Sequence, residues 1–130
     1  SNSGTAPAYG GFFYNLRALG ASFGVRYITD SSDYNTRKLG PNNCIVISLS
    51  NKGNQPVIYL PNDGVEGRII IVKQMGSGGI RVDTMGGQHL YDDSSENDYF
   101  EIGDGTMGVF IFGKWSINHV NKEIWSARII

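Results

Sequence analysis

Apolar side chains dominate three short segments of the chain. The clearest is Ile-Ile-Ile-Val at residues 69–72, and residues 44–49 and 109–112 have the same character. Because successive side chains of a strand point to opposite faces, each of these segments would form a strand that is apolar on both faces. A small two-layer domain shelters one face of each sheet, so the second faces need another layer, another segment or another subunit. We expect self-association.

The rest of the chain alternates short strand-like segments with turns rich in glycine, asparagine and proline. The polar loop at 30–42 is the longest connection, and residues 9–19 favour either one helical turn or a first strand. Turns that favour positive φ between short strands are typical of antiparallel all-β folds. We therefore predict an antiparallel β-sandwich or jelly-roll-like module, without a parallel βαβ unit, whose strands span residues 22–29, 44–49, 57–60, 68–73, 80–83, 89–91, 99–102, 109–112, 115–118 and 124–128.

The length of 130 residues fits one domain. Residues 1–8 are small and polar, as in a flexible tether or a remnant of cloning, and residues 9–130 are predicted to form the single β-sandwich domain. The net charge of −1 disfavours nucleic-acid binding. Because no apolar run approaches the ~18–20 residues of a membrane helix, we expect a soluble module without membrane insertion.

Few residues point to catalysis, metals or cofactors. The string at 20–24 matches a nucleophile elbow and the string at 103–108 matches a dinucleotide loop, but a strand-like segment follows each, where both motifs need a helix. His89 and His119 lack partners at metal-ligand spacing, and Cys44 is predicted to be an inert buried strand residue. We expect no enzyme activity, no metal and no cofactor, and take 103–108 as a glycine-rich hairpin.

Aromatic and polar residues gather in two places where a sugar could bind. Aromatic rings pack against the apolar side of a sugar, while carboxylates, amides and arginine bind its hydroxyl groups. The alternatives are that the acidic run at 92–98 is a solvated loop, and that Trp115 and Trp125 are anchors of the core or of a subunit interface. The candidate ligand residues are Tyr34, Asn35 and Arg37 in the polar loop, and Tyr91, Asp92, Asp93, Asn97, Tyr99 and Trp115 near the acidic run.

Residues 56–118 carry a pattern similar to that of a known class of proteins. Leu60-Pro61, a turn, Gly67 and the Ile/Val run ending at Lys73 are followed by a short strand at 79–82 and a late Gly-Lys-Trp at 113–115. This pattern resembles the C-terminal domains of bacteriophage tail-fibre and related virion-appendage proteins.

The resemblance implies a homotrimeric receptor-binding or head domain, exposed on the virion, that recognises a host-surface glycan or protein, with carbohydrate as the expected ligand. A trimerisation or assembly domain of a fibre and a polysaccharide-modifying hydrolase are the alternatives. The residues expected at the subunit interface are Ile69, Ile71, Phe110 and Phe112.

Overall fold

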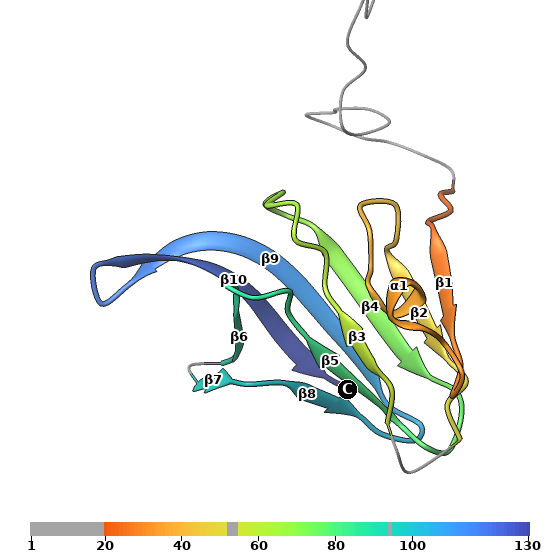
Figure 1. The fold of residues 1–130 in the computed structure, drawn as a ribbon. Coiled ribbons are helices and arrows are strands. Elements are labelled where there is room, and N and C mark those ends of the chain that lie inside the picture. Colours follow the sequence, from red (N-terminus) through yellow and green to blue (C-terminus); the bar gives the residue numbers. More distant parts are fainter. Residues whose placement is uncertain (1–19, 52–54, 94) are drawn as a thin grey trace, which may run out of the picture.

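The chain folds into two mixed β-sheets, and the all-β prediction is confirmed (Figure 1). The computed structural model describes residues 20–51, 55–93 and 95–130. In spatial order, the seven-stranded sheet consists of β1 (Val25–Ile28), β2 (Ile45–Ser48), β4 (Ile69–Gln74), β9 (Met107–Ile117), β10 (Val120–Ile129), β6 (His89–Asp92) and β7 (Ser95–Asn97). The three-stranded sheet consists of β3 (Val57–Tyr59), β5 (Ile80–Asp83) and β8 (Phe100–Ile102).

The prediction of purely antiparallel pairing is wrong. Strands β1 and β2, β2 and β4, β3 and β5, and β6 and β10 pair in parallel. The reason is that the chain alternates between sheets: β3 lies in the small sheet, so β2 and β4 enter the large sheet in the same direction. The polar loop joins the parallel strands β1 and β2 and contains a helical turn, α1 (Tyr34–Arg37). We did not predict this parallel connection.

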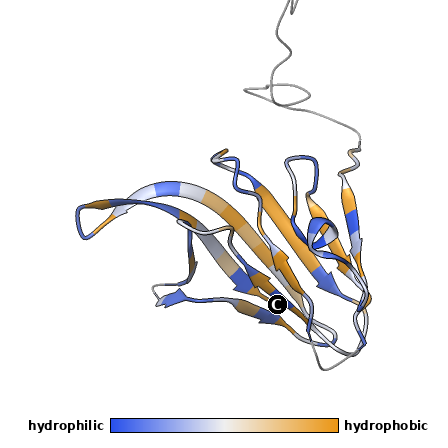
Figure 2. Ribbon diagram, in the orientation of Figure 1, coloured by the Kyte–Doolittle hydropathy of each residue, from blue (hydrophilic) through white to orange (hydrophobic). Residues whose placement is uncertain are grey.

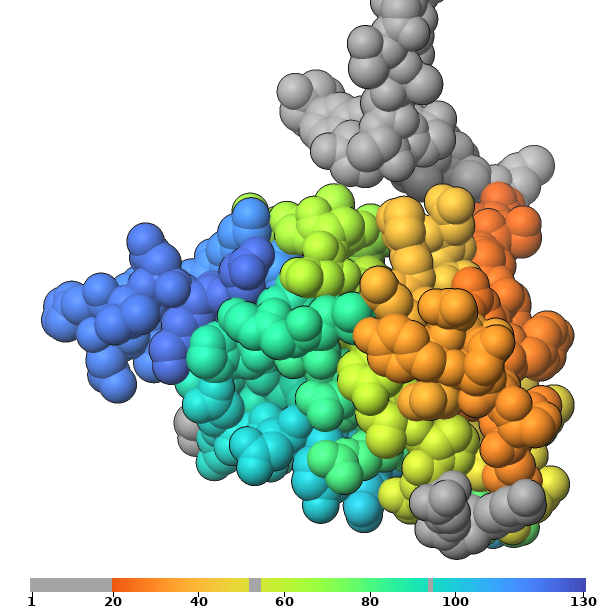
Figure 3. Space-filling view, in the orientation of Figure 1, coloured from red at the N-terminus to blue at the C-terminus, as the bar shows by residue number. Residues whose placement is uncertain are grey.

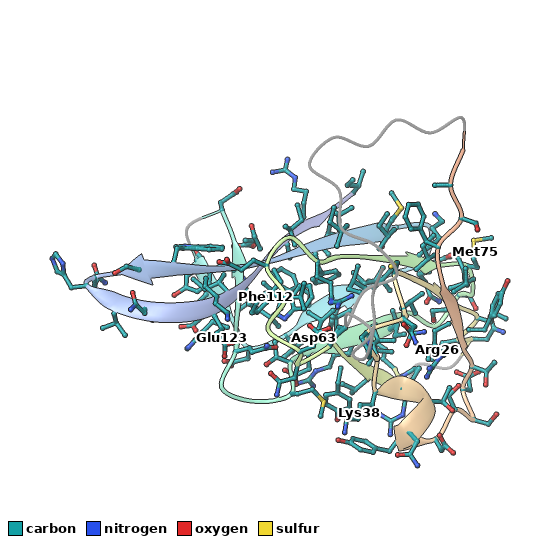
Figure 4. All side chains as sticks on the ribbon, turned by 90° about the horizontal axis from the view of Figure 1, so that it is seen from above. Arg26, Lys38, Asp63, Met75, Phe112 and Glu123 are labelled. Carbon is teal, nitrogen blue, oxygen red and sulfur yellow. The ribbon has the colours of Figure 1, made fainter. Side chains whose placement is uncertain are left out.

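The core lies between the two sheets, and both contribute alternate side chains to it. Strand β4 shows the alternation: Ile70 and Val72 are fully buried, whereas Ile69 and Ile71 keep exposed surface. Figure 2 shows the apolar centres of β4 and β9, and Phe112 is labelled among the interior side chains in Figure 4. The buried cluster comprises Ile28, Leu39, Val46, Ile58, Leu60, Ile70, Val72, Ile80, Val82, Leu90, Phe100, Ile102, Phe110, Phe112, Trp125 and Ala127.

Strands β9 and β10 form a long hairpin that extends beyond the rest of the domain (Figures 1 and 3). We predicted a break near Gly113, yet β9 continues through it to Ile117. Glycine lets the Trp115 ring lie against the backbone here, because a Cβ at position 113 would lie 2.5 Å from Cζ3 of Trp115. The turn is a two-residue one, Asn118-His119, with φ angles of 52° and 65°, as in the tight hairpin turns that favour asparagine.

Other predictions have mixed outcomes. The segment at 20–24 leads into β1 and the segment at 103–108 into β9, so no helix follows either string. The segment at 103–108 does not form a hairpin, because β8 and β9 lie in different sheets. The interpretations of residues 1–8 and 9–19 lie outside the described residues. In the part of the chain that the structure describes, no helix is long and apolar enough to cross a membrane.

Candidate functional site

The outer side of the large sheet carries an apolar surface, which we call the apolar face; Lys73 lies beside Ile47 at its border. The register of the paired strands places four of its residues in one row across β1, β2, β4 and β9: Val25, Ile45, Ile71 and Val109. Within this surface, Tyr27 is 61% exposed, Ile69 48% and Ile111 45%. The apolar face consists of Val25, Tyr27, Ile45, Ile47, Ile69, Ile71, Val109 and Ile111.

A hollow of about 360 Å³ opens at one side of the apolar face. Cys44 lines it and is half-buried, so the prediction of a buried strand position is wrong: the residue precedes β2 rather than lying within it. Its backbone is fixed, because its amide donates to the Gly24 carbonyl at 3.0 Å. The hollow is lined by Phe23, Cys44, Ile45, Gly67, Arg68, Ile69 and Ile71.

The four residues predicted at a subunit interface lie on opposite sides of the sheet. Ile69 and Ile71 belong to the apolar face, but Phe110 is fully buried in the core and Phe112 is 2% exposed. The assignment of the two phenylalanines to an interface is therefore wrong. A strand that is apolar on both sides does not reveal from its sequence which side faces inward.

Three of the predicted ligand residues come together at one place, which we call the acidic hollow. Asp92 ends β6, Asn97 ends β7, and Tyr99 precedes β8, so the hairpin and the next connection bring all three to one opening. The hollow has a volume of about 450 Å³ and is lined by Asp92, Asn97, Asp98, Tyr99, Phe100, Glu101 and Ile129. A neighbouring hollow of about 360 Å³ shares Asp92 and adds Asp93 and Arg128.

Arg81 fixes the aromatic ring at the acidic hollow. The guanidinium carbon of Arg81 lies 3.5 Å from the centroid of the Tyr99 ring, a close cation–π contact. Tyr99 remains 39% exposed, so one part of its ring is held and another is accessible. Arg81 was not predicted, because nothing along the chain shows that β5 pairs with β8 and places it near Tyr99.

Tyr91 and Trp115 do not line the acidic hollow. Because Leu90 and Asp92 point toward the interior side of β6, Tyr91 points to the outer side of the large sheet. There its hydroxyl lies 3.4 Å from Nζ of Lys122, the residue directly opposite Trp115 in the hairpin. The structure thus separates the predicted residues into two sites on opposite faces of the large sheet.

The predicted ligand residues of the polar loop form a third group around α1. Arg37 is engaged by the backbone: its Nη1 donates to the Val57 carbonyl at 2.7 Å and its Nε to the Ser32 carbonyl at 3.2 Å. Tyr34 packs against Tyr59 with ring centroids 5.5 Å apart, and Asn35 is exposed. Arg37 therefore secures α1 to β3.

Asp33 caps the N-terminus of α1. The amide of Thr36 donates to its carboxylate at 2.8 Å, and this hydrogen bond lowers the pKa of Asp33 below its ordinary value of 3.8. Because the pKa of Asp33 is lower in the folded protein, the ionised cap stabilises the fold at pH values above the pKa of the unfolded chain. This stabilisation is lost as the pH falls through the pKa of the folded protein. The cap should therefore weaken only below about pH 3.8.

We expect Asp33→Ala to speed hydrogen exchange at the amides of Arg37 and Lys38, which bond to the carbonyls of Asp33 and Tyr34. Exchange measured by NMR, corrected for intrinsic rates, should show this loss at neutral pH. Asp33→Asn is the matched control, since it keeps an acceptor oxygen without the charge and should retain protection that does not change with pH. Unchanged exchange in Asp33→Ala would contradict the role of the cap.

Across residues 20–51, 55–93 and 95–130, no three His, Cys, Asp or Glu side chains are arranged to hold a metal ion. The acidic run does not form one loop, because Ser95–Asn97 pairs with β6 as strand β7. His89 contacts the carboxylate of Glu96 on the outer side of this pair of strands.

The comparisons with known proteins add no family assignment. No family model matches the sequence, and no curated protein or solved structure matches the chain.

Proposed function

We propose that this domain is a non-enzymatic, self-associating head domain of a viral fibre, exposed on the virion, that binds host-surface carbohydrate. In this proposal the two sheets act as a β-sandwich, and three copies pack through the apolar face. The observation that carries the proposal is the apolar face, with Ile69 and Ile111 almost half exposed side by side on β4 and β9. Contiguous apolar surface of this kind marks interaction sites in soluble proteins.

Self-association explains why the outer side of β2, β4 and β9 is apolar at all. Each half-exposed isoleucine that a second copy covers contributes about 25 cal/mol per Å² of buried apolar area. Closed symmetry then limits the assembly and leaves no apolar face open. A trimer and a viral setting are supported by the resemblance at residues 56–118 to tail-fibre domains.

The acidic hollow supplies the chemistry for a carbohydrate ligand. Asp92, Asn97 and Glu101 offer acceptors and donors for hydroxyl groups, and Tyr99 offers an aromatic face. Because three carboxylates line the hollow along with Asn97, it suits a neutral sugar and repels an anionic one. Arg81 orients the Tyr99 ring before binding, which lowers the entropic cost of ordering it.

Light scattering of the 130-residue protein tests self-association. The expected mass is a stable multiple of 14.2 kDa, with three copies as the proposed state. A protein that stays monomeric at high concentration would contradict the proposal. Neutral and anionic glycans on an array, together with intact host cells, test ligand binding on the same sample.

Tyr99→Ala is expected to weaken binding of a neutral glycan by about tenfold or more, because the loss of one stacked aromatic ring removes on the order of 1–3 kcal/mol. Tyr34→Ala is the matched control: it removes an exposed tyrosine on α1, which does not line the acidic hollow. Binding curves from calorimetry or an array would measure both. Equal losses in the two variants would contradict the placement of the ligand.

A structural assembly domain is the second candidate, and the same apolar face favours it. In that case the surfaces serve only other subunits of the fibre. A stable oligomer that binds no glycan and no host cell would support this role over receptor binding.

A further inference from the structure

The outer side of the long hairpin carries a second site, which we call the hairpin platform: Trp115 on β9, Lys122 on β10 and Tyr91 on β6. Trp115 and Lys122 are directly opposed in the β9–β10 register, so their side chains start about 5 Å apart on one face. The Lys122 ammonium lies 3.4 Å from the Tyr91 hydroxyl. Figure 3 shows that the hairpin projects from the body of the domain.

The Trp115 ring is held in place by the strand beneath it. A Cβ at position 113 would approach Cζ3 of the ring to 2.5 Å and Cε3 to 2.9 Å, so the six-membered ring lies on the bare backbone of Gly113. Ile124, opposite Gly113, is fully buried although it lies on the outer side and outside the core cluster formed by the described residues. Trp115 is nevertheless 43% exposed, so the ring is a fixed and accessible aromatic surface.

Lys122 supplies an uncompensated positive charge beside this ring. Within the described parts of the chain no carboxylate forms an ion pair with it, and Glu96, the acid on the same side of β7, contacts His89 instead. An ammonium has three donors, and the contact with Tyr91 accounts for one. Lys122 is half-buried, so an anion bound there would be screened less by water than at a fully exposed lysine.

We propose that the hairpin platform binds a sugar that bears a carboxylate, such as a uronic acid. The apolar side of the sugar ring packs on Trp115, the carboxylate accepts from Nζ of Lys122, and the Tyr91 hydroxyl binds the same group or a neighbouring hydroxyl. The inference rests on the proposed carbohydrate function and adds a second site of opposite charge preference to the acidic hollow. A second copy of the chain is the poorer occupant, since an interface would bury the ammonium without an assigned partner.

NMR of the 130-residue protein labelled with ¹⁵N tests the proposal, with methyl glucuronide and methyl glucoside as probes. The two ligands differ by one carboxylate in place of a hydroxymethyl group. The indole signal of Trp115 should shift on addition of the glucuronide, and much less with the glucoside. Trp125 is an internal control, because its buried indole donates to Oε1 of Gln88 at 3.0 Å and should not shift.

Lys122→Gln should weaken glucuronide binding about tenfold, and Lys122→Arg should preserve most of it, since a charged hydrogen bond is lost only in the first. An unchanged Trp125 signal shows that each variant is folded. Equal shifts of Trp115 with both ligands, or equal affinity in Lys122→Gln, would overturn the role of the cation. A glucoside that shifts the Tyr99 amide, with no effect of glucuronide on Trp115, would overturn this inference and leave the proposed function standing.

Discussion

Ile71→Lys combined with Ile111→Lys is expected to convert the assembled protein into monomers. Both side chains lie on the apolar face, on the adjacent strands β4 and β9. Because Ile111 is 45% exposed and Ile71 is less exposed in the single chain, covering the rest of both side chains contributes about 1–2 kcal/mol. At 1.4 kcal/mol for each tenfold change in affinity, the loss of both raises the dissociation constant about 5–30-fold. The buried lysines add a desolvation cost of their own. Light scattering across a dilution series measures the change.

Asn35→Lys combined with Asn62→Lys is the matched control, because it adds the same charge at two exposed positions away from the apolar face. It should leave the mass unchanged. Circular dichroism of both variants confirms that the fold is retained. Two observations would contradict the proposed interface: an unchanged mass in the isoleucine variant, or equal dissociation in the control.

The apolar face also shows how far the sequence predicts the fold. The run at 69–72 correctly indicated two apolar sides, because the alternation of side chains is a local property of a strand. Strand pairing is not local. Turn residues reveal where the chain reverses, but they do not show that β3 joins the other sheet, and this choice makes β2 and β4 parallel neighbours.

The candidate site was predictable only in part, because nearness along the chain can be read from the sequence, whereas strand pairing cannot. Asp92, Asn97 and Tyr99 are close in sequence, and a tight hairpin brings such neighbours to one hollow. Tyr91 was grouped with them by the same proximity, yet it points to the opposite side, because adjacent residues in a strand alternate. Lys122 was missed, since only the pairing of β6 with β10 brings it to Tyr91.

Phe110→Ala is expected to lower the free energy of unfolding by about 3–5 kcal/mol, the usual cost of removing a fully buried phenylalanine. The ring is wholly inaccessible and packs edge-on against Phe100, with centroids 5.9 Å apart. Gly108 leaves room for the ring: a Cβ there would lie 2.8 Å from Cε2 of Phe110. Chemical denaturation, at concentrations where light scattering reports monomer, measures this cost without any contribution from association.

Ile111→Ala is the matched control, one residue along the same strand. Its side chain is 45% exposed in the single chain, so its truncation should cost about 1 kcal/mol in the monomer. In the assembly the difference between the two variants narrows, because Ile111 then also loses the area that a second copy covers, whereas Phe110 touches no subunit. The cost of Ile111→Ala should therefore rise with protein concentration, whereas the cost of Phe110→Ala should not depend on it. If Phe110→Ala costs less than Ile111→Ala in the monomer, the inward side of β9 has been assigned wrongly, and with it the apolar face.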